Sequence, residues 1–234
     1  MLNKPVNILF TRQLDAMLLQ KAELKKILID TATFIVTEPV TEAATIEKIK
    51  SQSHQKTTVV FTSTNAIEAV KMQLTNQPDW DIYCIGGSTK EAVIDFLGEG
   101  TIKASAKSAA NLADKIIATN TVKKVVFFCG DQRLTTLPET LTANGIEVNE
   151  VIVYQTILTP QIIEKNYIGI AFFSPSAVHS FFSENTIGTN VIMFAIGKTT
   201  AATIASYCSN QIVTCEWPGS EQMVEAIHHY FEKN

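Results

Sequence analysis

Short apolar runs alternate along this chain with longer stretches in which apolar residues return every three or four positions. The runs predict β-strands near residues 6–11, 33–39, 58–62, 81–85, 101–103, 124–129, 147–155, 169–173, 191–196 and 212–214. Helical periodicity fills most of the intervals between them. Because parallel strands need a crossover connection that is usually a helix, this alternation predicts an α/β protein with parallel sheets.

The chain also matches itself at a constant shift of 111 residues, so that residues 59–117 align with residues 170–228 without a gap. Only eight of the 59 aligned pairs are identical, which is little above chance. The order of features carries more weight, because each copy runs strand, hydroxyl residue, helix, strand, glycine, hydroxyl residue, helix. NILFTRQ and KVVFFCGDQR, which lie outside the two copies, match each other more loosely. We therefore predict two similar doubly wound α/β units.

Hydroxyl residues mark the predicted helix starts in both copies. Ser63 and Ser174 stand where N-caps are expected, and Ser88 or Thr89 opens a helix that Gly98 closes. A cap of this kind contributes about 1 kcal/mol to stability, so capping alone is one complete explanation of these residues.

A second explanation is ligand binding, since open α/β sheets bind ligands at the carboxyl ends of their strands, beside helix N-termini. If the two units face each other across a cleft, Ser63, Asn65 and Thr89 line one wall. The other wall is then lined by Ser174, Ser176, Thr199 and Thr200. This arrangement predicts a duplicated pair of anion cradles that suit carboxylates as well as phosphates.

The stretch AIGKTT resembles part of a phosphate-binding loop, whose full form needs an opening glycine five positions before the Gly-Lys pair. Counting back from Gly197 reaches Ile192, which belongs to an apolar run and reads as strand. The pattern therefore argues against a nucleotide site at this position.

Composition narrows the class of protein further. The chain has 234 residues, 46% hydrophobic and 18% charged, and a net charge of −4, which argues against a general nucleic-acid surface. No apolar run is long enough to span a membrane, and the first residues lack a signal-peptide layout, so we expect a cytoplasmic protein. Four cysteines without a C-x-x-C spacing are expected to be reduced thiols.

Several motifs taken together resemble the uroporphyrinogen-III synthase family. They are an early strand ending before Arg12, then VVFTSTNAIEAV, CIGGSTKEAV, FFCGDQRLTTLPETLTANGIEVNEVIVYQT, AFFSPSAVHSFF and AIGKTTAATI. The resemblance implies two flavodoxin-like domains. A simple tandem duplication would divide the chain into two consecutive domains near Asn120, but the resemblance implies a different division. Residues 1–35 with 157–234 would form one domain, residues 40–150 would form the other, and residues 36–39 and 151–156 would be linker strands.

The resemblance also implies an activity, the cyclisation of hydroxymethylbilane to uroporphyrinogen III with inversion of the last pyrrole ring. This reaction of a linear tetrapyrrole requires neither a metal nor an organic cofactor. The substrate carries eight carboxylates, which suits helix N-termini even on an acidic protein. We expect a monomer that binds this small molecule and neither nucleic acid nor membrane.

The same resemblance supplies candidate residues. Tyr154, in VIVYQT, matches the family's tyrosine and is the candidate for hydrogen bonding to, or protonating, the leaving hydroxyl. The cleft positions of the family are matched by Thr89, Ser174 or Ser176, Thr199 and Thr200. Arg12 and Arg133 follow strands and could pair with carboxylates, although Arg133 could equally be structural. Ile192 stands where some members carry a lysine, and Lys198 is the candidate to replace that cation.

Two other functions remain open at this point. A non-enzymatic, hinge-closing binding protein for a small anion would share the architecture, and a nucleotide-dependent enzyme would use GKTT. An interaction scaffold is disfavoured because hydroxyl and glycine residues recur at strand ends in both copies.

Overall fold

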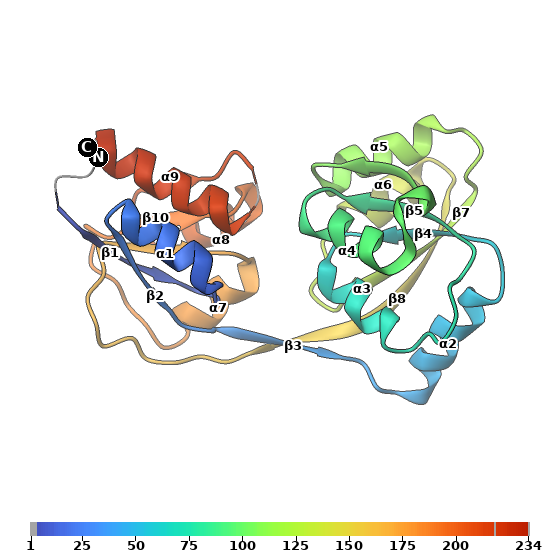
Figure 1. Ribbon diagram of the computed structural model, residues 1–234, viewed down its shortest axis with the longest axis horizontal. Coiled ribbons are helices and arrows are strands. Elements are labelled where there is room, and N and C mark those ends of the chain that lie inside the picture. The colour runs from blue at the N-terminus through green and yellow to red at the C-terminus, as the bar shows by residue number, and fades with distance from the viewer. Residues whose placement is uncertain (1–3, 218, 234) are drawn as a thin grey trace. The chain divides into compact units, whose positions relative to one another are not determined.

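The protein is described by a computed structural model over residues 4–217 and 219–233. The chain divides into two compact units (Figure 1). Unit 1 comprises residues 1–36 and 157–234, and unit 2 comprises residues 37–156. The chain leaves unit 1 within one strand, β3 (Ile35–Pro39), and returns within another, β8 (Glu147–Leu158). The residues predicted as linker strands lie inside these two elements.

Unit 1 is built on a five-stranded sheet of order β2-β1-β9-β10-β11, in which every neighbouring pair is parallel. Its strands are β1 (Val6–Phe10), β2 (Ile27–Thr31), β9 (Gly169–Phe172), β10 (Ile192–Ala195) and β11 (Ile212–Thr214). Both faces of a parallel sheet must be covered. Helices α1 (Ala16–Leu24) and α9 (Ser220–Lys233) cover one face, and α7 (Pro175–Phe182) and α8 (Lys198–Ala205) cover the other.

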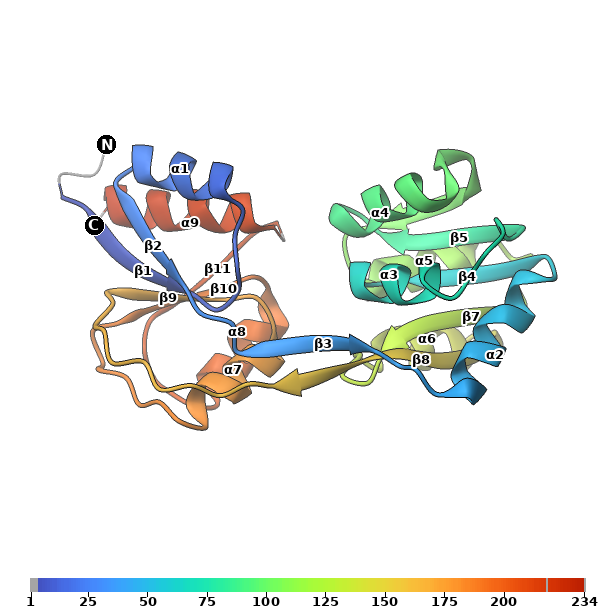
Figure 2. The same cartoon turned by 60° about the horizontal axis from the view of Figure 1, so that its bottom comes forward.

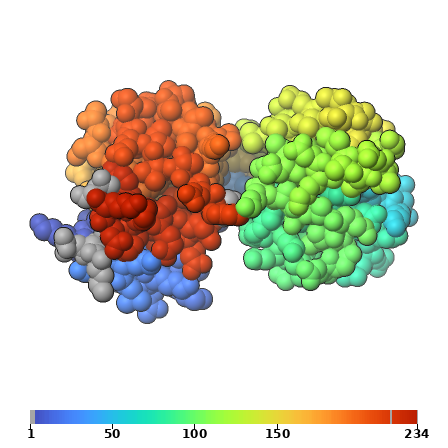
Figure 3. Space-filling model, turned by 90° about the horizontal axis from the view of Figure 1, so that it is seen from above, coloured from blue at the N-terminus to red at the C-terminus, as the bar shows by residue number. Residues whose placement is uncertain are grey.

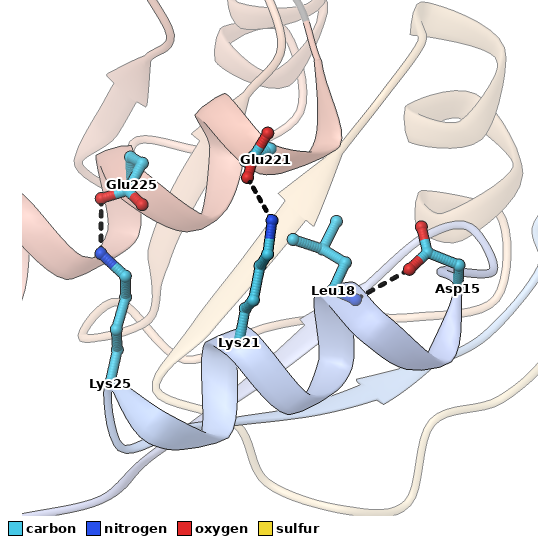
Figure 4. A network of polar contacts seen from close by, with 6 residues as sticks. All are labelled: Asp15, Leu18, Lys21, Lys25, Glu221 and Glu225. Atoms are coloured by element: carbon cyan, nitrogen blue, oxygen red, sulfur yellow. Dashed lines mark hydrogen bonds and ion pairs between the residues drawn. The ribbon is translucent and has the colours of Figure 1, made fainter.

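The pairing of α1 with α9 joins the two distant chain segments of unit 1 (Figure 4). Lys21 of α1 and its C-cap residue Lys25 form ion pairs with Glu221 and Glu225 of α9, at 2.9 and 2.7 Å. Beneath these exposed pairs, both helices bury apolar side chains against the same face of the sheet. In the space-filling view of Figure 3, the red surface of α9 borders the blue surface of the N-terminal segment. Burial of this shared apolar face, more than the exposed ion pairs, holds the discontinuous unit together.

Unit 2 is built on a sheet of order β3-β8-β7-β4-β5-β6, in which the pairs from β8 to β6 are parallel. Besides β3 and β8, its strands are β4 (Thr57–Phe61), β5 (Trp80–Ile85), β6 (Ile102–Ala106) and β7 (Lys124–Gly130). One face is covered by α2 (Ala43–Ser53), α3 (Thr64–Lys71) and α4 (Ser88–Leu97), and the other by α5 (Ala109–Ala118) and α6 (Thr136–Ala143) (Figure 2). A short 3₁₀ turn, η1 (Glu99–Thr101), precedes β6.

The internal repeat is confirmed element by element. Helix α3 lies 111 residues before α7, and the pairs β4 and β9, β5 and β10, α4 and α8, β6 and β11, and α5 and α9 correspond at nearly the same shift. The looser match of the front parts is confirmed as well, because β1 and β7 occupy equivalent places in their sheets. Unit 1 has the flavodoxin-like strand order, and in unit 2 the strands β8-β7-β4-β5-β6 occupy the same places with a circularly permuted connection, because the chain enters this sheet at β4. Both units are doubly wound, and the predicted fold class is correct.

One strand was missed by the sequence pattern. Residues 27–31 form β2, at the edge of the unit 1 sheet, where the sequence indicated a continuation of the preceding helical stretch. The helix ends at Lys25 without a glycine or proline signal, because Lys26 itself takes a left-handed conformation, with φ of 59°. A lysine in this role gives no sequence warning that the chain reverses.

Candidate functional site

Each sheet has one place where the chain connections depart in opposite directions, and ligands of open α/β sheets bind there, outside the carboxyl ends of the strands. In unit 1 this switch point lies between β1 and β9. In unit 2 it lies between β7 and β4. We therefore describe the carboxyl-end edge of each sheet separately, as the unit 1 edge and the unit 2 edge.

At the unit 2 edge, the tyrosine singled out from the sequence meets one of the predicted hydroxyl residues. The Oη atom of Tyr154 donates a hydrogen bond of 3.2 Å to Oγ of Ser63. Ser63 is the N-cap of α3, and its Oγ also accepts a bond of 3.1 Å from the backbone N–H of Asn65. Both acceptor positions of the serine oxygen are therefore used, and its hydroxyl hydrogen remains available to a further acceptor.

Tyr154 lies on β8, an interior strand flanked by β3 and β7. Its ring is partly buried, and burial raises the pKa of the phenol above its ordinary value of 10.0, while the bond to Ser63 lowers it. The phenol is consequently protonated at neutral pH and is a hydrogen-bond donor. A protonated donor beside a helix N-terminus at a switch point is what a group acting on a leaving oxygen requires.

The remaining predicted residues of unit 2 lie at the starts of α3 and α4. Asn65 is exposed in the first turn of α3, whereas Thr89 is buried in the first turn of α4. Thr64 and Ser88 join the two turns through a hydroxyl contact of 3.5 Å. Helix α4 begins at Ser88 and has Gly98 as its C-cap, so the predicted start and end of this helix are confirmed. The N-cap itself is Gly87 and not a hydroxyl residue, because its φ of 73° is a backbone conformation that glycine adopts without strain.

Arg133 follows β7 and is held by Glu150 of β8, its Nε donating to a carboxylate oxygen. The bond to Glu150 raises the pKa of Arg133 further. Both side chains are about 30% exposed or less. Its charge is therefore largely neutralised within unit 2, which favours the structural alternative for this arginine.

Arg12 stands in a different environment at the unit 1 edge. Its guanidinium lies 5.3 Å from the centre of the Phe173 ring, at cation–π distance. Within the described chain no carboxylate forms an ion pair with it. The preceding residue, Thr11, is buried and donates a hydrogen bond of 2.9 Å to the carbonyl of Ala171, which ties the end of β1 to β9. Arg12 therefore projects an uncompensated cation from a rigid strand end.

The other predicted residues of unit 1 lie at the starts of α7 and α8. Ser174 is the N-cap of α7 and accepts a bond of 3.1 Å from the N–H of Ala177, and Ser176 lies in the first turn of the same helix. Thr199 is exposed and Thr200 is buried in the first turn of α8. Lys198 opens α8 and forms no ion pair with any described residue.

The turn before α8 also explains the GKTT stretch. Only Ile196 and Gly197 separate β10 from α8, so the connection is too short to form a phosphate-binding loop. The hydroxyl residues of this stretch instead belong to the helix start that matches the start of α4 in unit 2.

Sequence reasoning missed three residues at these edges. They are Gly130, which ends β7, and the residues that follow β1 and β7, which are Thr11 and Asp131. Both strands border a switch point. The position of Gly130 and Asp131 in FFCGDQR, just after a buried strand, was a usable signal, but a lone Gly-Asp pair is also an ordinary turn.

Three hollows formed by described residues contain none of the predicted site residues. A groove of about 740 Å³ in unit 1 is lined by residues of α9 and of the segment 213–217, and contains none of them. A second hollow, of about 310 Å³, lies at the amino-terminal ends of β4 and β7. Along the described chain, no helix combines the length and apolarity needed to cross a bilayer.

Comparison with known proteins identifies one family by sequence and the same fold by structure. The sequence profile of uroporphyrinogen-III synthase matches residues 28–225. A crystal structure of the enzyme from Helicobacter pylori superposes with a TM-score of 0.69 at 15% identity, covering 96% of this chain and 99% of that one. A mutant of the enzyme from Thermus thermophilus superposes with a TM-score of 0.66 at 12% identity, covering 98% and 100%. At these identities the superpositions establish the fold alone.

The fold defines a doubly wound α/β protein of two units with parallel sheets. The profile match, which extends over most of the chain, gives the family: the chain belongs to the uroporphyrinogen-III synthases. This is a family of cofactor-independent cyclising lyases of haem biosynthesis.

Proposed function

We propose that this protein converts hydroxymethylbilane to uroporphyrinogen III, with Tyr154 acting on the leaving hydroxyl and both sheet edges binding substrate carboxylates. The observation that carries the assignment is the hydrogen bond between Tyr154 and Ser63 at the switch point of unit 2. It presents a protonated phenol where the fold binds ligands.

The first chemical step is loss of the substrate hydroxyl, which leaves a delocalised cation. A phenol with a raised pKa is a weak acid toward the intact alcohol. As the carbon–oxygen bond breaks, however, the departing oxygen approaches hydroxide, whose conjugate acid, water, is a much weaker acid than a phenol. Once the phenol turns its hydrogen from Ser63 toward that oxygen, proton transfer from Tyr154 becomes favourable late in bond cleavage, and water is the leaving group.

Ser63 completes this step by stabilising the tyrosine after it has given up its proton. Its hydroxyl hydrogen is not engaged by the two bonds that the oxygen accepts, so the serine can rotate and donate to the developing phenolate. The N-terminus of α3 adds partial positive charge at the same point. Proton transfer then leaves no unpaired buried anion.

The carboxylates of the substrate are bound by the remaining predicted residues. Arg12 offers a cation that no described carboxylate neutralises, which supports its role in pairing with an acetate or propionate group. Hydroxyl and amide groups at helix starts supply further donors in both units, from Ser63, Asn65, Thr89, Ser174, Ser176, Thr199 and Thr200. Binding through helix N-termini is compatible with the protein's net charge of −4.

Control of the product is a question of substrate shape. The cation can close directly to the uninverted isomer, whereas isomer III requires attack through a strained spiro intermediate. Each 1.36 kcal/mol of preference changes the product ratio about tenfold, and orientation effects reach roughly 7 to 11 kcal/mol. Fixing the carboxylates therefore suffices to select the inverted product without an acid–base dyad or a cofactor.

We also propose that the enzyme acts as a cytoplasmic monomer, in which residues 1–35 with 157–234 and residues 40–150 are domains linked by residues 36–39 and 151–156. The division of contacts at residues 36–37 and 156–157 supports this assignment. Light scattering of the purified protein at micromolar concentration should give the mass of a single chain, and a dimer mass would contradict the monomer.

The activity itself is tested by generating hydroxymethylbilane in situ, adding the protein, oxidising the products and separating the porphyrin isomers by chromatography. Predominant isomer III is the expected result. Isomer I alone, at the uncatalysed rate and from folded protein, would overturn the proposed activity and favour a hinge-type binding protein. A thermal-shift assay with ATP and magnesium tests whether the GKTT stretch binds a nucleotide. We expect no change in the melting temperature.

A further inference from the structure

Tyr154 packs directly on the backbone of Gly130, the last residue of β7. A Cβ atom at position 130 would lie 2.6 Å from Cε2 and 2.7 Å from Oη of Tyr154, and closer still to Cζ. Real Cβ atoms do not approach other heavy atoms so closely, and the obstacle is a whole ring rather than a flexible chain end. Glycine is therefore the residue that allows the phenol to lie where it reaches Ser63.

The sheet pairing changes register at the same place. Cys129 pairs with Ile152, but Gly130 pairs with Tyr154, so β8 carries one extra residue opposite the end of β7. Val151 and Val153 face the core beneath α3 and α4, and strict alternation would turn residue 154 to the opposite face. Tyr154 nevertheless packs against that same core. The irregularity therefore re-aims the tyrosine, as β-bulges beside active sites do.

Asp131 holds the backbone of β8 directly after the tyrosine. Its backbone N–H donates a bond of 3.2 Å to the carbonyl of Tyr154. Its carboxylate accepts a bond of 2.8 Å from the N–H of Thr156. Two successive peptide groups just after the shifted register are thus hydrogen-bonded by one residue, which fixes the backbone that follows the tyrosine.

We propose that Gly130 and Asp131 are positioning residues for Tyr154, and that this Gly-Asp pair determines how efficiently the enzyme expels the substrate hydroxyl. The inference deepens the proposed function and rests on it for its catalytic consequence. Its structural part concerns the position of one phenol and is measurable without substrate.

Gly130→Ala is the primary test. The added methyl group must displace the ring, and a misplacement of about 1 Å can cost on the order of 10²-fold in rate. We expect kcat to fall by about that factor while KM changes by less than about twofold, because the carboxylate-binding residues stay in place. Equal changes in kcat and KM, or an unchanged kcat, would overturn the proposal.

A double-mutant cycle separates position from folding. In the Tyr154→Phe background, the phenylalanine ring still collides with the methyl group that Gly130→Ala introduces, so Gly130→Ala keeps its cost in stability. The phenylalanine has no hydroxyl group that this collision could misplace, however. Gly130→Ala should therefore lower kcat in the wild type and leave it nearly unchanged in the Tyr154→Phe background. Equal losses in both backgrounds would show that position 130 acts only through folding.

The aspartate is tested by a conservative pair. Asp131→Ala removes the acceptor for the N–H of Thr156, whereas Asp131→Asn keeps an oxygen at that place. We expect roughly a tenfold loss of kcat in the alanine variant and recovery to within about twofold in the asparagine variant. Equal losses in both would reject the hydrogen-bonding role.

A spectroscopic measurement keeps this inference distinct from the proposed activity. The protein has five tyrosines, which can be labelled with ¹³C at Cζ, and Tyr154→Phe identifies the resonance of Tyr154. Gly130→Ala and Asp131→Ala should shift that resonance and lower the pKa of the phenol toward its ordinary value.

Gly169→Ala is the matched control, because a Cβ there would also collide with ring and methyl atoms, but within unit 1. This control should lose stability and leave the Tyr154 resonance unchanged. An unmoved resonance in Gly130→Ala would contradict the positioning role whether or not the wild type makes isomer III.

Discussion

The two edges start from the same scaffold and end with different chemistry. At the unit 1 edge, the arginine after β1 rests on Phe173 and no described carboxylate neutralises it. At the unit 2 edge, the arginine after β7 is paired with Glu150, and a tyrosine approaches the N-cap serine of α3. The residue aligned with Phe173 in unit 2 is Thr62, so the ring that supports Arg12 has no counterpart there.

The difference shows how a duplicated fold divides one task. Helix caps and strand order are common to both units, because the backbone requires them wherever a parallel strand feeds a helix. The backbone requires neither an unpaired arginine nor a tyrosine at a strand end, and the two edges differ in these side chains. We therefore expect variants of the unit 1 edge to affect substrate binding, and variants around Tyr154 to affect the chemical step.

The largest effect is expected for Tyr154→Phe. General acids of this type contribute about 10² to 10⁴ in rate, so kcat should fall by at least about 10²-fold. The thermal midpoint should change little, since one neutral hydrogen bond is worth about 1 kcal/mol. Tyr207→Phe, which removes an exposed hydroxyl bonded to His179 in unit 1, is the control and should keep full activity. Full activity of Tyr154→Phe would remove the tyrosine from the mechanism.

The two arginines give the sharpest test of the comparison. Arg12→Gln should raise KM about tenfold with kcat unchanged, because a charge-assisted bond to a carboxylate contributes about 1.5 to 3 kcal/mol. Added salt should raise KM of the wild type and reduce the difference between the two proteins. Arg133→Gln should change KM by less than about twofold, since its charge is already neutralised by Glu150. A larger effect at Arg133 than at Arg12 would reverse the assignment of the two edges.

The cap serines provide a smaller effect on matched sites. Ser63→Ala and Ser174→Ala should each destabilise the protein by about 1 kcal/mol, because each removes the cap of an equivalent helix. Only Ser63 also contacts the tyrosine, so only its variant should lower kcat, by roughly fivefold, beyond any change in KM. Stopped-flow rates and thermal melts measured on the same samples distinguish the two losses. Equal kcat in both variants would show that Ser63 is a cap and nothing more.

The smallest effect is expected from pH. Burial raises the pKa of Tyr154 above 10.0, so the phenol should stay protonated and kcat should not fall through its ionisation below about pH 10. The free energy of unfolding follows the same direction. Because the pKa of Tyr154 is higher in the folded than in the unfolded protein, stability is unaffected below the unfolded-state pKa and falls as the pH rises past it. A tyrosine-dependent decline of kcat centred near pH 8, absent from Tyr154→Phe, would contradict this environment.

The proposed site could be read from the sequence only in part. Ser63 and Ser174 were predictable as caps, because capping depends on residues within one turn of each other. Arg12 and Arg133 looked equivalent in the sequence, since each follows an apolar strand. Glu150 lies 17 residues from Arg133, and nothing local in the sequence announces their pairing. The edge strand β2 escaped for a similar reason, because Lys26 ends a helix in a conformation that lysine rarely adopts.

The sequence by itself determined the α/β class, the duplication and the order of elements in each copy. These follow from hydrophobic periodicity, turn residues and caps, which act over a few residues and therefore leave a local pattern. Only the tertiary structure decided that Gly130 lies under the Tyr154 ring and that Tyr154 reaches a serine 91 positions away. Such contacts depend on strand order and on a one-residue shift of register, which turns a side chain to the other face of a sheet and leaves no mark in the composition of either strand.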